Sequence, residues 1–83
     1  MTAQERAARV RLTFPAELVR QPVIGELVRR FGVLPNIRRA DVSDDVGWIV
    51  CELDGEAHRV EEAIAWMEQI GVDVEPLEQP LEG

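Results

Sequence analysis

Four stretches of the chain have the alternation of apolar and polar residues, or the short apolar run, that is typical of β-strands. They are Arg9–Phe14, Asn36–Val42, Val46–Leu53 and Val72–Glu75. The second and third are separated only by Ser43, Asp44 and Asp45, so they predict a β-hairpin. Pro76 ends the last stretch, since proline removes a hydrogen-bond donor from a strand.

Two other stretches place apolar residues at helical spacing. The first stripe is Ile24, Leu27, Val28 and Phe31, and the second is Val60, Ala63, Ile64, Met67 and Ile70. Gly32 and Gly71 follow these stripes in the position of left-handed C-caps, and Asp54-Gly55 is expected to turn the chain into the second helix. Trp66 flanks the second stripe and is expected to seal the edge of the core.

This element order, β-α-β-β-α-β, predicts an α+β fold of the ferredoxin-like type. Right-handed crossovers close it into a four-stranded antiparallel sheet with both helices on one face. The first and third strands are then central and the second and fourth are edges. We expect one domain over residues 9–77, with residues 1–8 and 78–83 as loose tails.

The alternation also assigns side chains to the two faces of the sheet. If Ile49, Cys51 and Leu53 face the helices, Trp48 and Val50 lie on the open face, where an exposed tryptophan indicates an interface. The open face also carries charges of both signs, at Arg9, Arg11, Glu52, Asp73 and Glu75, so cross-strand pairing explains them without a ligand. The arginines at 29, 30, 38 and 39 fit a helix end and a solvated strand edge better than a basic binding patch.

Composition and charge restrict the function. The 83 residues carry sixteen acidic and nine basic side chains, a net charge of −7, which disfavours nucleic acid and anionic membrane surfaces as partners. Cys51 is the only cysteine, so no intrachain disulfide and no cysteine-rich metal site can form, and we expect no cofactor. With no apolar leader or membrane span, a cytoplasmic location is expected.

No catalytic or metal-binding constellation stands out in the sequence. His58 is the sole histidine and lacks partners at a useful spacing, and Cys51 is expected to be buried as a small hydrophobe. There is no glycine-rich phosphate loop and no paired acid and base. We therefore expect a protein that is not an enzyme.

The order of several motifs resembles the NIL domain family, a ferredoxin-like module named after an Asn-Ile-Leu run. The motifs are RLTF, QPVIGELVRRFGV, PNI, GWIVCELDG and EEAIAWMEQIGVDVEPL, which together span Val10 to Leu77. The family occurs at the C-terminus of the ATPase subunit of methionine ABC importers, where paired domains bind methionine and inhibit transport. It also occurs beside ferredoxin-type iron–sulfur domains linked to sulfur assimilation.

The resemblance implies a ligand site at Asn36, Ile37 and Arg38, where Arg38 replaces the leucine of the family motif. Without the resemblance, an Asx-type turn after Pro35 is the better explanation of Asn36, and with the resemblance the two explanations are equal. The implied function is a non-catalytic regulatory domain that senses methionine or a related amino acid at a homodimer interface, formed by edge pairing or face packing. The alternative is a module without a small ligand that docks through Trp48 and the acidic surface on a sulfur-assimilation or iron–sulfur protein. A methionine importer ATPase is the other possible partner.

Overall fold

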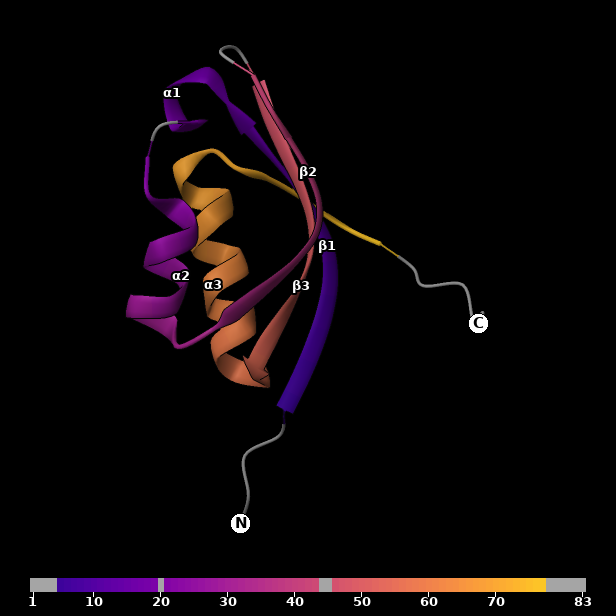
Figure 1. Ribbon diagram of the computed structural model, residues 1–83. Helices are drawn as coiled ribbons and strands as arrows, with labels where there is room; N and C mark the ends of the chain where they lie inside the picture. Colours follow the sequence, from indigo (N-terminus) through magenta and orange to yellow (C-terminus); the bar gives the residue numbers. More distant parts are fainter. Residues whose placement is uncertain (1–4, 20, 44–45, 78–83) are drawn as a thin grey trace.

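A computed structural model describes residues 5–19, 21–43 and 46–77 of the chain. The elements in chain order are β1 (Glu5–Pro15), α1 (Ala16–Val19), α2 (Val23–Phe31), β2 (Leu34–Val42), β3 (Val46–Glu56), α3 (Ala57–Ile70) and β4 (Asp73–Pro76). The strands form one antiparallel sheet in the order β2-β3-β1-β4, and the helices lie on one face of it (Figure 1). The predicted ferredoxin-like fold is therefore confirmed.

The two central strands are longer than the sequence pattern predicts. β1 begins at Glu5 and β3 continues to Glu56, and the two strands pair over their full eleven residues. The predicted strand start at Arg9 and the predicted turn at Asp54-Gly55 were wrong because this long pairing keeps both segments extended. The predicted tails at residues 1–4 and 78–83 lie outside the described residues.

The helices end as predicted, and of the stripe predicted for α2 only Val28 turns away from the core. Gly32 and Gly71 adopt left-handed φ values of 66° and 108° and cap α2 and α3. The buried residues of α2 are Val23 and Leu27, whereas Val28, predicted to face the core, is 44% exposed. A single-turn helix, α1, lies in a segment for which the sequence pattern predicts neither a strand nor a helix.

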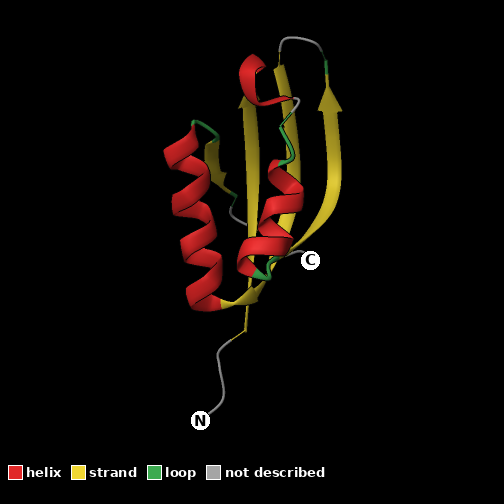
Figure 2. Cartoon of the chain, turned by 90° about the vertical axis from the view of Figure 1, so that its left-hand side faces the viewer, coloured by secondary structure: helices red, strands yellow, loops and turns green. Residues whose placement is uncertain are grey.

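The core lies between the helices and the central part of the sheet. The buried hydrophobic residues are Val10, Leu12, Phe14, Val23, Leu27, Val33, Ile49, Cys51, Leu53, Val60, Ala63, Met67 and Val72. Trp66 packs against this core, and the centroid of its ring lies 5.7 Å from the centroid of the Phe31 ring. It therefore seals an edge of the core as predicted. None of the nine residues of β2 is buried, and Figure 2 shows this strand at one edge of the sheet with no helix in front of it.

Candidate functional site

Asn36 lies inside the edge strand β2, not in a turn before it. Its backbone is opposite Glu52 of β3, and its amide nitrogen Nδ2 donates a hydrogen bond to Oδ2 of Asp54, 18 residues further along the chain. This long-range bond replaces the Asx-type turn that we considered for Asn36. The amide therefore stands on the open face of the sheet beside a carboxylate.

A β-bulge changes the direction of the Arg38 side chain, which follows the Asn-Ile pair. Ile37 is opposite Cys51 and Arg39 is opposite Val50, so Arg38 is the extra residue of the bulge. Nη2 of Arg38 donates to Oε1 of Glu52 at 3.3 Å. Asn36 and Arg38 thus approach neighbouring carboxylates of β3.

Glu52 lies between two arginines. Nη2 of Arg9 donates to its Oε2 at 2.9 Å, while Arg38 holds the other oxygen. The hydrogen bond from Arg9, and next the one from Arg38, lower the pKa of Glu52. If either arginine turns away, the other still gives the Glu52 carboxylate a cationic hydrogen-bond partner.

Ile37 belongs to the other face of the sheet. Its partner Cys51 is buried beneath the helices, so the side chain of Ile37 lies on the face of the sheet that carries the helices. The helices do not extend over β2 at this position, and Ile37 is therefore 51% exposed. The structure therefore brings Asn36 and Arg38 together and separates them from Ile37. A single ligand that touches all three must straddle the free edge of β2.

The two predicted interface residues, Trp48 and Val50, lie on the open face and are half-buried. The guanidinium carbon of Arg11 is 4.9 Å from the centroid of the Trp48 ring. This cation–π contact covers part of the indole. Trp48 is therefore less available to a partner than the sequence pattern indicated.

The other reactive side chains take structural positions. Burial raises the pKa of the Cys51 thiol to about 11, which makes it a poor nucleophile. His58 is exposed and its Nε2 lies 3.2 Å from Oε2 of Glu62. Among residues 5–19, 21–43 and 46–77, no three metal-ligating side chains gather into a possible site, and no helix is long and apolar enough to cross a membrane.

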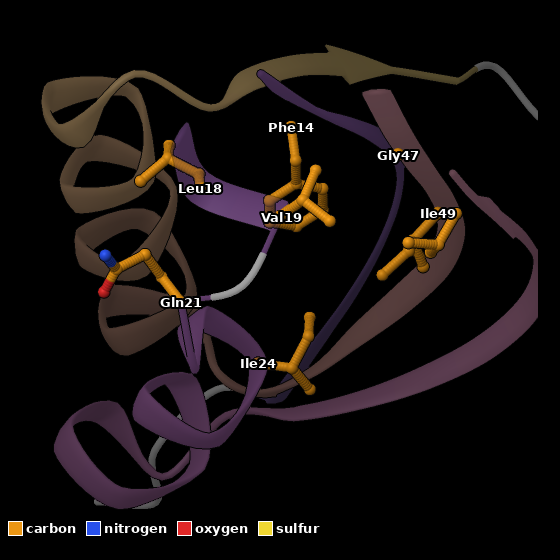
Figure 3. A pocket seen from close by; sticks show the side chains of 8 residues that line it. Phe14, Leu18, Val19, Gln21, Ile24, Gly47 and Ile49 are labelled. Atoms are coloured by element: carbon orange, nitrogen blue, oxygen red, sulfur yellow. The ribbon is translucent and has the colours of Figure 1, made fainter. Parts of the chain in front are cut away.

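A small apolar cavity of about 80 Å³ opens at the far end of β2, beside Val42 (Figure 3). Phe14, Val19, Ile24 and Ile49 converge on it. Sequence reasoning missed this cavity because it did not predict α1, which supplies Val19. It also missed Asp54, which had been assigned to a turn although the hairpin register places it beside Asn36.

Comparisons with known proteins agree with this fold. The NIL domain profile matches residues 8–76 of the chain. A crystal structure of the C-terminal domain of an ABC transporter ATP-binding protein from Enterococcus faecalis is similar, with a TM-score of 0.76 and 23% sequence identity, covering 89% of this chain and 87% of that one. No curated protein matches the sequence significantly. The extent of the profile match, together with the shared fold, shows that the chain belongs to the NIL domain family.

Proposed function

We propose that this chain is a non-catalytic regulatory domain that binds methionine or a related small amino acid between two copies of itself. One observation carries the proposal. The free edge of β2 presents Asn36 and Arg38 on one face of the sheet and the half-exposed Ile37 on the other, with Asp54 behind the asparagine. This edge offers polar and apolar contacts within three consecutive residues.

The polar groups match the two charges of a zwitterion. A ligand carboxylate can accept hydrogen bonds from Arg38 and from the amide of Asn36. Asp54, which already accepts from Asn36, can accept from the ligand ammonium. An apolar side chain would then lie across the edge against Ile37.

The double pairing of Glu52 makes Arg38 available to the ligand. If Arg38 turns to a bound carboxylate, Arg9 still neutralises Glu52 through its 2.9 Å contact. Leaving a carboxylate without any partner would oppose binding, and this arrangement avoids that cost. The proposed ligand therefore replaces one of two ion pairs and leaves the other intact.

The family and its setting support a regulatory role over a catalytic one. The structural neighbour is the C-terminal domain of an ABC transporter ATP-binding protein. The resemblance to the NIL family implies that such domains bind methionine and inhibit transport by the ATPase to which they belong. The docking alternative relies on Trp48, which is half-buried beneath Arg11, so it has less support.

Isothermal titration calorimetry of the purified protein with L-methionine tests the proposal, with homocysteine, cysteine and leucine as comparison ligands. We expect saturable binding of methionine that Asn36→Ala abolishes without loss of the folded circular dichroism spectrum. Gln69→Ala is the matched control, because it removes an exposed amide from α3, far along the chain from β2.

Two outcomes would contradict the proposal. If none of the four amino acids gave binding heat, the proposed ligand would be rejected and the docking alternative would be favoured. Normal binding by the Asn36→Ala variant would show that the site lies elsewhere, and the cavity beside Val42 would be the next place to test.

A further inference from the structure

The bulge in β2 brings two consecutive arginines to the same face of the sheet. In a regular strand, neighbouring side chains point to opposite faces, so Arg38 and Arg39 would be separated. Here Arg38 is the extra residue of the bulge, and its Nη2 donates to Oε1 of Glu52 on the open face. Arg39 is opposite Val50, whose side chain also lies on the open face. Two guanidinium groups from adjacent residues are therefore presented on this face.

The two arginines differ in the contacts that they make. Arg38 is paired with Glu52 at 3.3 Å. Arg39 is exposed and makes no ion pair with any carboxylate that the structure describes. Asp41, two residues further along β2 and opposite Trp48, lies beyond ion-pair distance of it. The guanidinium group of Arg39 is therefore available to an external anion.

The charges beside β2 follow a definite order along the open face. Asp54 lies beside Asn36 at one end, and Arg38 and then Arg39 follow along the strand. This order of one negative and two positive groups is complementary to an ammonium group followed by two acidic groups. A simple dianion fits less well, because Asp54 and the net charge of −7 on the chain would repel it.

We infer that the proposed site prefers an amino acid whose side chain ends in an acidic group, and that Arg39 binds this group. The inference rests on the proposed function and deepens it by naming the class of ligand. The ammonium and α-carboxylate groups keep their partners, Asp54 and Arg38. The terminal acid then accepts hydrogen bonds from Arg39. One small molecule can contact both arginines, because consecutive Cα atoms are only about 3.8 Å apart.

Val50 is suited to the methylene groups of such a ligand. It is half-buried on the open face, with Arg39 of β2 on one side and Arg11 of β1 on the other. Arg11 is held over the Trp48 ring and adds a second positive charge near the terminal acid. An acidic side chain therefore lies along the open face over Val50, whereas an apolar side chain crosses the edge to Ile37.

Three ligands of equal chain length test the inference by isothermal titration calorimetry. L-Methionine, L-methionine sulfone and L-homocysteic acid share the carbon chain and the sulfur atom, and the last two have nearly the same shape. Only homocysteic acid carries a negative charge at the end of its side chain. We expect its dissociation constant to be about fivefold lower than that of the sulfone, as for one exposed ion pair. The difference should shrink in 1 M NaCl, which screens exposed charges at about 3 Å.

Two variants separate the two directions of the side chain. Arg39→Gln keeps a polar side chain but removes the charge, so it should abolish the preference for homocysteic acid and leave methionine binding unchanged. Ile37→Ala should weaken methionine binding and leave the binding of homocysteic acid unchanged. Arg29→Gln is the matched control, because it removes the same charge from the exposed last turn of α2. It should preserve the preference.

Each outcome has a distinct meaning. Methionine binding without a preference for homocysteic acid over the sulfone would overturn the inference and leave the proposed function standing. A preference that persists in Arg39→Gln would also overturn it. If none of the three ligands bound, the proposed function would be rejected together with the inference. Binding of homocysteic acid alone, lost in Arg39→Gln, would support the inference and reject methionine as the ligand.

Discussion

β4 and β2 are both edge strands of one sheet, but β4 has four residues and β2 has nine. β4 pairs with Val10–Thr13 of β1, ends at a proline, and directs Val74 against the core. β2 runs along most of β3, has a bulge, and leaves Ile37 and Val42 exposed. A short edge with a proline resists further pairing, whereas a long uncovered edge permits it. The difference is one reason for our proposal that β2 serves an interaction, whereas β4 closes the fold.

The largest expected effect tests whether β2 contributes to the core of the single chain. Leu53→Ala removes a fully buried side chain of β3 and should cost about 2–5 kcal/mol of unfolding free energy. Ile37→Ala, on the neighbouring edge strand, should stay within about 1 kcal/mol because the side chain is already half-exposed. Urea unfolding followed by circular dichroism at low protein concentration gives both values.

An equal loss for the two variants would break the comparison. It would mean that Ile37 contributes as much to the folded single chain as a core residue does. Repeating the Ile37→Ala measurement at high protein concentration shows whether Ile37 stabilises the single chain or a dimer. A dimer contact stabilises only when the dimer is populated.

The next effect concerns the glycine that leads into each edge strand. Gly71, before β4, has φ 108°, and Gly32, before β2, has φ 66°, nearer the left-handed region that other residues occasionally adopt. Gly71→Ala should therefore cost more, about 1–3 kcal/mol, than Gly32→Ala at about 1 kcal/mol. The same unfolding experiment measures both.

Gly25→Ala is the control for this pair. Gly25 lies inside α2, and a Cβ atom there would meet nothing within 4 Å. The substitution should stabilise the protein by about 0.5–1 kcal/mol, because alanine is the better helix former. A larger loss at Gly32 than at Gly71 would show that the entrance to β2 is the more constrained of the two.

Residue patterns were sufficient to predict the topology of this fold, because each strand and helix carries its own period. They did not fix the ends of the central strands. Ala7 and Ala8 lack the contrast between apolar and polar residues, and Asp54-Gly55 has turn chemistry. Only the eleven-residue pairing of β1 with β3 keeps these residues extended, and a pairing partner is a tertiary property.

The candidate site was predictable only in part. Asn36, Ile37 and Arg38 came from a motif resemblance, and the distribution of these residues over two faces follows from the bulge between Ile37 and Arg39. A bulge depends on the register with β3, and the sequence pattern of β2 gives no sign of it. Asp54 shares a face with Asn36 for the same reason, because the register next to the turn would pair Asp54 with Pro35 if the bulge did not shift it by one residue.

The smallest expected effect concerns how firmly Arg38 holds β2 to β3. The pKa of Glu52 is lowered in the folded protein, first by Arg9 and then by Arg38. A carboxylate of this kind contributes stability that is present above its unfolded pKa and is lost as the pH falls through the folded pKa. Stability should therefore decline at pH below about 4.5 less steeply in Glu52→Gln than in the wild type.

An NMR titration of the Glu52 carboxyl separates the two arginines. Arg9→Ala should raise the pKa of Glu52 more than Arg38→Ala does, because Arg9 makes the shorter contact, 2.9 Å against 3.3 Å. That order would mean that Arg38 can leave Glu52 for a ligand or a second copy at little cost. The reverse order would mean that Arg38 anchors β2 to β3, and β2 would then resemble β4 as a closed edge.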